Sequence, residues 1–261
     1  MISIAIHGAA GRMGQRLVAL ASEDPQLKLV SAIDHPDDDK FGQDVGVVAG
    51  VGELGVLIGN QLPGSVDVVI DFSKPDGTRH ILETCTKSGI ALVIGTTGLT
   101  DEDQQLIEQA GQTISVLQTP NMSLGVNLLF ALVGQTAQTL GQDYDIEIVE
   151  THHRYKKDAP SGTALGIAQA ICQATGKSME SDLKYGRRGD DPRKPGEIGI
   201  HALRSGDVVG NHTASFTALG EEIQLTHIAT NRDIFARGAL RAAKWISDKE
   251  PGRYQMADML G

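Results

Sequence analysis

A short basic segment in the second half of the chain carries most of the side chains that could do chemistry. It reads His152-His153-Arg154-Tyr155-Lys156-Lys157. The chain has 23 Lys and Arg against 33 Asp and Glu, a formal net charge of −10, so such a cluster should attract a small anion. A histidine exchanges protons near neutral pH, and a lysine joins it when burial or neighbouring cations lower its pKa. We expect His152 and Lys156 to do acid–base work, as a reduction by hydride transfer would require.

A helix start follows this segment, at Ala159-Pro160-Ser161-Gly162-Thr163. It offers a hydroxyl group and free backbone N–H groups to a carboxylate. Two anion-binding features this close favour a small dicarboxylate ligand, although a solvated basic turn and an ordinary N-cap would explain the same residues. A zinc site is not expected, because adjacent residues of an extended segment, His152 and His153, point in opposite directions.

A second candidate site follows the first predicted strand, Ile2–Ile6. The run after it is Gly8-Ala9-Ala10-Gly11-Arg12-Met13-Gly14, and it opens a predicted helix. Glycines allow a tight turn and the close approach of a pyrophosphate, which the helix N-terminus attracts. Their spacing differs from the usual dinucleotide fingerprint, so a glycine-rich turn without a ligand is the alternative. Asp34 ends the second predicted strand and would bind the adenosine ribose.

The neighbours of Asp34 leave NADH and NADPH both open. A carboxylate disfavours a 2′-phosphate, whereas His35 and Arg12 could receive one. Further cofactor contacts are expected where later strands end, because ligands of such folds bind at that edge of the sheet. The two segments are Gly95-Thr96-Thr97-Gly98 and Thr119-Pro120-Asn121-Met122. A plain turn competes with ligand contact at the first, and a hinge between domains competes at the second.

Alternating strand and helix patterns over the first 120 or so residues predict a parallel, helix-covered sheet. The predicted helices are Arg12 to about Ser22, Gly77–Ser88 and Asp101–Ala110, the last capped by Thr100 with Asp103 at N3. The predicted strands are Ile2–Ile6, Leu27–Ile33, Val66–Phe72, Ala91–Ile94 and Ser115–Leu117.

The pattern after Pro120 predicts a second, α+β domain. Helices are expected over Leu124–Leu140 and Thr163–Thr175, a strand over Asp145–Glu150, and an antiparallel meander over Glu197–Ile228. The residues Tyr185–Pro195 lack apolar periodicity, so we expect an exposed mobile loop. A final helix over about Ile234–Ser247 would return to the first domain.

The fold class is therefore α/β, a Rossmann-type parallel sheet with a second α+β domain that contains an open mixed or antiparallel sheet. We expect a dinucleotide-binding domain over 1–122 and 233–261 and a substrate-binding domain over 123–232. The negative charge argues against nucleic-acid binding. The longest apolar stretch, Ser123 to Gly134, is far shorter than the roughly 20 residues that span a bilayer. Without a secretory signal pattern, we expect a cytoplasmic protein.

The chain resembles the 4-hydroxy-tetrahydrodipicolinate reductase family, also called dihydrodipicolinate reductase. The motifs that carry the resemblance span nearly the whole chain. They are the glycine-rich run, Val69-Ile70-Asp71-Phe72-Ser73, Gly95–Gly98, Asn121–Asn127, Glu150–His153 through Lys156–Ala164, and Gly206-Asp207-Val208-Val209-Gly210-Asn211-His212.

The resemblance implies hydride transfer from NADH or NADPH to the cyclic imine dicarboxylate 4-hydroxy-tetrahydrodipicolinate, with loss of water, in lysine and diaminopimelate biosynthesis. His152 would donate or accept a proton, Lys156 would donate one, and His153 would bind substrate. Gly162 and Thr163 would hold a substrate carboxylate. The cofactor residues would be Gly8, Ala9, Ala10, Gly11, Arg12, Met13, Asp34, His35, Gly95, Thr96, Thr97, Thr119, Pro120, Asn121 and Met122.

The resemblance also implies a homotetramer assembled through the sheet of the second domain, and no metal. Some members have arginine where His35 stands, so tight NADPH binding is less expected here. Two alternatives are a dehydrogenase acting on a semialdehyde or a sugar, and a nucleotide-binding regulatory protein of the same fold without turnover. Cys85 and Cys172 are the only cysteines and are expected to be buried thiols, and Cys85 is not expected to be a nucleophile.

Overall fold

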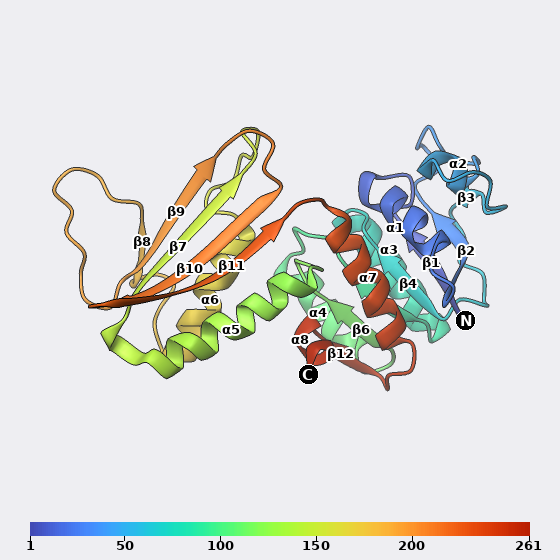
Figure 1. Cartoon of the computed structure of the whole chain (residues 1–261). Coiled ribbons are helices and arrows are strands. Elements are labelled where there is room, and N and C mark those ends of the chain that lie inside the picture. Colours follow the sequence, from blue (N-terminus) through green and yellow to red (C-terminus); the bar gives the residue numbers. More distant parts are fainter. The chain divides into compact units, whose positions relative to one another are not determined.

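A computed structural model describes all 261 residues, which form two compact units. Unit 1 comprises Met1–Ser123 and Asp233–Gly261, and unit 2 comprises Leu124–Arg232. Unit 1 contains a parallel sheet with helices and unit 2 a mixed sheet with two long helices, so the predicted fold class is confirmed (Figure 1). None of the helices combines the length and the apolar character that crossing a membrane requires.

The sheet of unit 1 has seven strands in the order β12-β6-β5-β4-β1-β2-β3, and every neighbouring pair is parallel. Parallel strands need crossover connections, which helices provide here. The carboxyl ends of β1, β2 and β4 carry His7, Asp34 and Asp71. The strands are β1 (Ile2–His7), β2 (Leu27–Ile33), β3 (Ile58–Gly59), β4 (Val68–Asp71), β5 (Ala91–Ile94), β6 (Ser115–Gln118) and β12 (Gly252–Tyr254).

The helices of unit 1 begin and end where local chemistry allows. The predicted capping box is present at α4, where Thr100 and Asp103 bond to each other's backbone N–H groups. The C-caps of α2 and α3, Gly50 and Gly89, have positive φ, which glycine adopts without strain. The helices are α1 (Arg12–Ser22), α2 (Val45–Ala49), α3 (Pro75–Ser88), α4 (Asp101–Ala110), α7 (Asp233–Ile246) and α8 (Met256–Leu260).

Helix α7 follows unit 2 in the sequence but packs in unit 1, against α1 and the strands β4, β5 and β6. Its alanines, leucine and final isoleucine are buried along one side. A Cβ atom at Gly238 would lie 1.7 Å from the carbonyl oxygen of Met122, so only glycine lets α7 pack this closely. The end of the chain is therefore part of the core of unit 1.

The sheet of unit 2 corrects part of the sequence prediction. Its order is β11-β10-β7-β9-β8, and β9 pairs in parallel with β7 and β8. Only β10 and β11 form the predicted antiparallel hairpin, and β10 pairs antiparallel with β7 on its other side. The predicted three-stranded meander is wrong because β9 and β10 lie on opposite sides of β7. The strands are β7 (Asp145–His152), β8 (Leu183–Tyr185), β9 (Ile198–Arg204), β10 (Gly210–Ala218) and β11 (Glu221–Ala229).

Two helices, α5 (Leu124–Leu140) and α6 (Gly162–Thr175), pack on each other and against this sheet (Figure 1). A short 3-10 turn, Gly141–Asp143, leads from α5 into β7. The core joins apolar residues of both helices to Ile146, Ile148 and Phe216 of the sheet. Gly166 of α6 lets Phe130 of α5 approach, because a Cβ there would lie 2.7 Å from the ring.

The predicted mobile loop is more restrained than expected. Tyr185 belongs to β8, and two arginines of the following segment, Arg187 and Arg193, form ion pairs with other parts of unit 2. Arg187 pairs with Glu147 and Glu197, and Arg193 pairs with Glu147 and with Asp145. Residues 188–190 between them are exposed. The absence of apolar periodicity correctly indicated an irregular segment but carried no information about these long-range charge pairs.

Candidate active site

The buried face of β7 turns polar at its carboxyl end. Every second residue of β7 is buried. Ile146 and Ile148 point into the core, and the same alternation continues to Glu150 and His152, which are also buried. On β10, His212 lies directly opposite Glu150, and His212 is 4% exposed. The alternation that builds the core thus places three titratable side chains together at one end of it.

Glu150 is the centre of this cluster and has no exposed surface. Its Oε1 accepts hydrogen bonds from the backbone N–H of Ser161 (3.0 Å) and from Nη2 of Arg204 (3.1 Å). Its Oε2 accepts from Nδ1 of His152 (2.5 Å) and from Nη1 of Arg204 (2.9 Å). Burial alone would raise the pKa of Glu150, but the hydrogen bonds from Arg204 and His152 outweigh it and hold the pKa below its usual value. The carboxylate is therefore ionised at neutral pH.

His152 is held by this carboxylate at one ring nitrogen only. Its ring also meets the ring of His212 edge to face, with 5.1 Å between centroids. Burial lowers the pKa of His152, and the positive charges of Lys156 and Arg204 add to that effect, against the opposite influence of Glu150. His152 is consequently a neutral imidazole near pH 7, able to take up a proton and return it.

The predicted basic segment contributes one residue, His152, to this cluster, and its other residues lie outside it. Lys156 forms an ion pair with Asp158 (2.8 Å), a partner that the sequence analysis did not consider. His153 is half-buried, and its Nε2 lies 3.5 Å from Nη2 of Arg232. Arg154 and Tyr155 are exposed. Of the six residues of the segment, only His152 belongs to the buried cluster.

The predicted helix start is present at α6. Ser161 is the N-cap, and its Oγ accepts a hydrogen bond from the N–H of Ala164 (3.2 Å). The same Oγ lies 3.1 Å from Nε2 of His212, whose burial lowers its pKa to about 4. At Gly162 a Cβ would meet nothing within 4 Å, so open space adjoins the helix N-terminus. This space, a helix dipole and no acidic residue in the first turn suit an anion.

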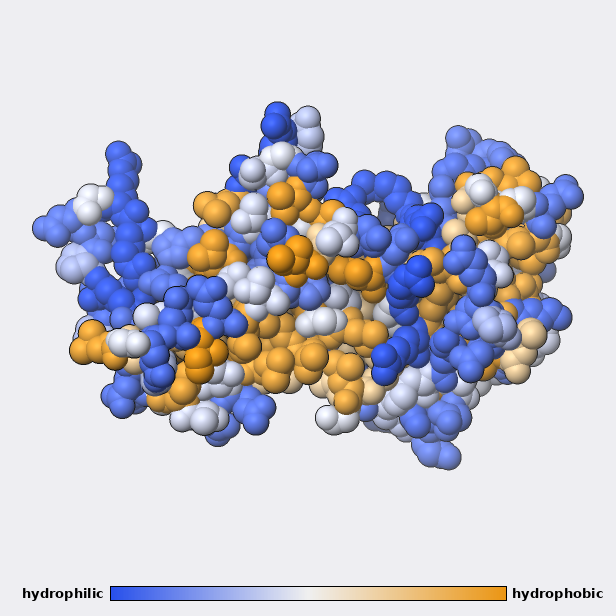
Figure 2. Space-filling view, in the orientation of Figure 1, coloured by the Kyte–Doolittle hydropathy of each residue, from blue (hydrophilic) through white to orange (hydrophobic).

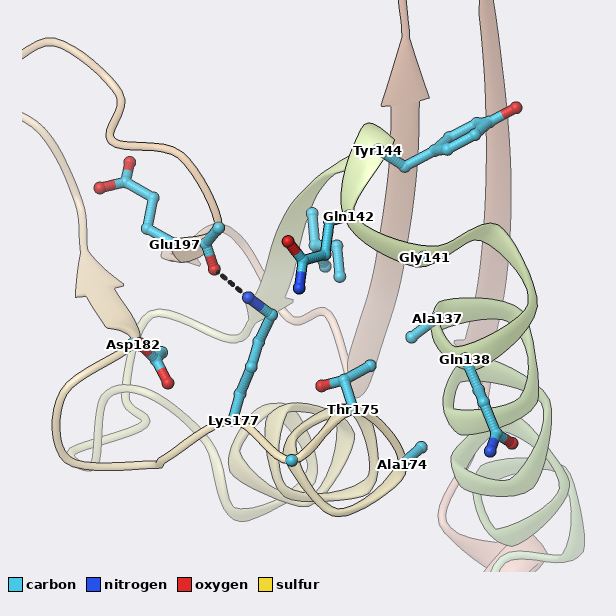
Figure 3. Close-up of a pocket in the computed structure, with 13 residues that line it drawn as sticks. Ala137, Gln138, Gly141, Gln142, Tyr144, Ala174, Thr175, Lys177, Asp182 and Glu197 are labelled. Carbon is cyan, nitrogen blue, oxygen red and sulfur yellow. Dashed lines mark hydrogen bonds between the residues drawn. The ribbon is translucent and has the colours of Figure 1, made fainter.

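A hollow of about 380 Å³ lies at the other end of α6, away from these residues (Figure 3). It is lined by the carboxyl ends of α5 and α6 and by the segments that follow them, and Lys177 Nζ donates to the carbonyl oxygen of Gly196 (2.7 Å) at its edge. None of the predicted site residues lines it. The candidate chemistry is therefore not in this hollow.

In unit 1, the glycine-rich turn between β1 and α1 has the features of an anion site. Helix α1 begins after Gly11 with no side-chain cap and no acidic residue in its first turn, unlike α4. No side chain therefore caps the first N–H groups of this helix, the kind of group that binds anions. Gly8 and Gly14 are needed for packing as well, since a Cβ would lie 2.5 Å from the Phe72 carbonyl oxygen at Gly8 and 2.1 Å from the Gly8 oxygen at Gly14.

Asp34 lies against this turn, as the ribose prediction requires. Its Oδ2 accepts a hydrogen bond from the N–H of Ala10 (2.8 Å), while Oδ1 accepts from the N–H of His35 (2.8 Å). The side chain of His35 is largely exposed. Lys40, which no sequence motif indicated, lies at the same turn: its Nζ donates to the carbonyl oxygen of Ala10 (2.9 Å) and adds a cation there.

A second buried carboxylate, Asp71, organises the neighbouring strand ends and was named only within a motif. It accepts hydrogen bonds from Nδ1 of His7 (2.8 Å) and from three hydroxyl groups. The hydroxyls are those of Ser73 (2.6 Å), Thr78 (2.6 Å) and Thr96 (2.9 Å). The Thr96 hydroxyl is therefore committed to the protein, whereas Thr97 is exposed.

The predicted segment Thr119–Met122 is divided in the same way. Thr119 Oγ1 bonds to the backbone of Asn121, and both Thr119 and Met122 are buried. Pro120 is exposed.

Cys85 is buried, which raises the pKa of its thiol to about 12, and Cys172 is also buried, so neither thiol is a nucleophile. No group of histidine, cysteine or carboxylate side chains is arranged to hold a metal ion.

Comparison with known proteins gives a consistent result over the whole chain. Residues 2–122 match the family model for the N-terminus of dihydrodipicolinate reductase, and residues 125–260 match the model for its C-terminus. The chain is 45% identical to a 4-hydroxy-tetrahydrodipicolinate reductase of Syntrophotalea carbinolica, covering 100% of this chain and 99% of that protein. It is also 45% identical to one of Alkalilimnicola ehrlichii, covering 99% and 98%.

Solved structures include one from Paenisporosarcina sp. TG-14, a dipicolinate-bound dihydrodipicolinate reductase. It is 26% identical, with a TM-score of 0.77 over 98% of this chain and 97% of that one. A probable dehydrogenase from Thermotoga maritima has a TM-score of 0.64 over 98% and 92% at 13% identity, which shows a shared fold alone.

Proposed function

The chain belongs to the dihydrodipicolinate reductase family, and from that membership we infer that it reduces 4-hydroxy-tetrahydrodipicolinate with a nicotinamide cofactor in lysine and diaminopimelate biosynthesis. The observation that carries the proposal beyond the family is the buried Glu150–His152 pair, with open space at Gly162 at the start of α6. It combines a proton-exchanging imidazole with a place for a carboxylate, as a dicarboxylate substrate requires.

His152 and Lys156 are proposed to handle the protons of the reaction. The bound nicotinamide would supply the hydride. His152 exchanges a proton through the ring nitrogen that Glu150 does not hold, and Lys156 delivers a proton from its ammonium group once it leaves Asp158. The cationic segment 152–157 also offsets the negative charge of the substrate.

The substrate carboxylates are proposed to bind at two places in unit 2. Gly162 and Thr163, in the first turn of α6, would hold one carboxylate with backbone N–H groups and the Thr163 hydroxyl. His153 would contact the other. Unit 2 is then the substrate-binding unit, and unit 1, with the glycine-rich turn, is the dinucleotide-binding unit.

The cofactor residues are proposed to be those of the glycine-rich turn, with Asp34, His35 and the segments 95–97 and 119–122. The fit rests on the uncapped start of α1 and on Asp34 beside the turn. Asp34 favours NADH, and His35 with Lys40 offers cations to a 2′-phosphate, so we propose that both cofactors are used, with NADH preferred. Thr96 and Met122 would contribute backbone contacts, because their side chains are buried.

We propose a homo-oligomer formed through the sheet of unit 2 and a cytoplasmic location. Large apolar side chains are exposed on the outer face of this sheet, with Leu203 at 51% and Ile228 at 62%. Apolar groups also show along α5 in Figure 2. Exposed apolar area of this kind is typical of interfaces between subunits. Light scattering of the purified protein would give the number of subunits.

The test is to mix the purified chain with freshly generated 4-hydroxy-tetrahydrodipicolinate and follow the loss of absorbance of NADH and NADPH in parallel. Turnover with either supports the proposal, and the ratio of the kcat/KM values gives the preference. Cofactor binding without turnover would instead support a regulatory nucleotide-binding protein of the same fold.

A further inference from the structure

We propose that Glu150 and Arg204 are positioning residues for this reaction: Glu150 fixes the tautomer of His152, and Arg204 ties that pair to the backbone of the loop that bears Lys156. The proposal rests on the proposed function for its kinetic consequences. Neither side chain was assigned a role from the sequence, and neither has to touch the substrate to act in this way.

The hydrogen bond to Glu150 decides which nitrogen of His152 carries the proton. An ionised carboxylate only accepts, so Nδ1 of His152 must be the donor across the 2.5 Å contact. In the neutral ring Nε2 then has a lone pair and is the atom that takes up a proton. Nε2 has no partner within the chain, and a Cβ at Gly210 would lie 2.9 Å from it, so the absence of a side chain at 210 keeps this atom accessible.

Arg204 connects the pair to the loop. It lies opposite His152 in the parallel pairing of β9 with β7 and forms two hydrogen bonds with Glu150. The same guanidinium donates to the carbonyl oxygen of Asp158 (2.6 Å) and, more weakly, to that of Lys156 (3.4 Å). A lysine could not reach these acceptors together, because only the planar guanidinium presents several donors in fixed directions.

The charge balance of the buried cluster requires both Glu150 and Arg204. Removing one partner of a buried ion pair leaves the other charge uncompensated. His152 is faced by Glu150 on its own strand, Arg204 on β9, His212 on β10 and Lys156 on the loop, and of these only Glu150 is anionic. Loss of the Glu150 charge therefore lowers the pKa of His152. It also removes the preference for the tautomer of His152 that is protonated at Nδ1.

The experiment compares E150Q and R204K with E147Q, a matched control. Glu147 lies on the same strand but on its outward face, where it pairs with His201 and two arginines. We expect E150Q to lower kcat roughly 10²-fold and R204K about 10-fold, with the Kd of NADH unchanged, as for other residues that orient a catalytic histidine. The low-pH limb of the kcat profile should move to lower pH in E150Q. E147Q should keep its kcat within about 2-fold.

A second readout needs no substrate. In ¹⁵N-histidine spectra recorded above pH 7, His152, assigned by its loss in H152Q, should be protonated at Nδ1 in the wild type and lose that preference in E150Q. Protonation at Nε2 in the wild type would overturn the proposal, even if E150Q fails to fold. Equal kcat values for E150Q and E147Q would overturn it as well. An absence of turnover in the wild type, with the Nδ1 tautomer observed, would reject the proposed function and leave the positioning of His152 intact.

Discussion

Each unit contains a buried carboxylate that accepts a hydrogen bond from Nδ1 of a histidine: Asp71 from His7 in unit 1 and Glu150 from His152 in unit 2. Both carboxylates are completely buried. Around Asp71 the other donors are three hydroxyl groups and the backbone N–H of Ser73, whereas around Glu150 they are a guanidinium and the backbone N–H of Ser161. The two pairs thus share one local geometry in different surroundings.

The surroundings decide what each pair can do. The hydroxyl donors of Asp71 come from the β4–α3 connection, α3 and the β5–α4 connection, so Asp71 joins segments of unit 1 to one another. The donors of Glu150 belong to β7, β9 and the start of α6, next to a cationic loop. A carboxylate–histidine pair is therefore not by itself a sign of catalysis, and the guanidinium of Arg204 on Glu150 is what distinguishes the pair in unit 2.

The sharpest test of this contrast is to remove the imidazoles. His152→Gln should lower kcat by about 10²- to 10⁴-fold, the usual range for lost acid–base catalysis, and Lys156→Ala should do the same, with little change in the Kd of NADH. Steady-state kinetics with cofactor titrations measure both quantities. His7→Gln is the control and should change kcat by less than about 3-fold. Unchanged turnover in both unit 2 variants would remove the assigned roles.

The matching variant in unit 1 changes the carboxylate Asp71 and should affect stability rather than turnover. Asp71→Asn replaces an acceptor of five hydrogen bonds with a group that must also donate, and it should lower the free energy of unfolding by about 2–3 kcal/mol. Urea denaturation measures the change. At temperatures where the variant is folded, its kcat should stay near that of the wild type. A loss of kcat without a loss of stability would make the two carboxylates equivalent and end the distinction.

A third variant addresses the cofactor side of unit 1. Asp34→Ala removes the expected ribose acceptor and its charge, so the Kd of NADH should rise about 10-fold, while that of NADPH should rise less because a repulsion is relieved. Fluorescence titration with both cofactors gives the two ratios. Equal losses would mean that Asp34 acts only by holding the N–H of Ala10.

The smallest effect concerns acid stability in unit 1. The hydrogen bond from Arg79 and the N–H of Thr100 lower the pKa of Asp103 to about 2. A carboxyl group with a lowered pKa stabilises the folded state above its ordinary pKa, and this contribution is lost as the pH falls from about 4 toward 2. Asp103→Asn should therefore reduce Tm much more at pH 6 than at pH 2. A Tm difference that is constant with pH would contradict it.

The sequence was sufficient where the determining interactions are local. The period of apolar residues located most helices and strands, and Thr100 with Asp103 marked the start of α4 because a capping box spans four residues. The prediction of a meander was wrong because strands that follow one another in the sequence need not pair in the sheet. The partner of β9 is β7, about 50 residues earlier, and nothing in the residues of β9 encodes that choice.

The candidate site shows the same limit. The basic segment and the start of α6 stand out in the sequence, but Arg204, His212 and Lys40 reach their places through strand pairing and turns. One signal was present. The alternation of Ile146 and Ile148 continues to Glu150 and His152, which puts a carboxylate at an inward-facing position and predicts that it needs partners.

The return of the chain to unit 1 at Asp233 has a consequence for synthesis. Unit 2 is one continuous segment and can fold as soon as it has left the ribosome. Unit 1 needs α7 against β4, β5 and β6, and β12 at the edge of its sheet, and these elements are translated after unit 2. The nucleotide-binding unit, although it is begun first, is therefore the one that is completed last, and a chain released before α7 would carry an unfinished core.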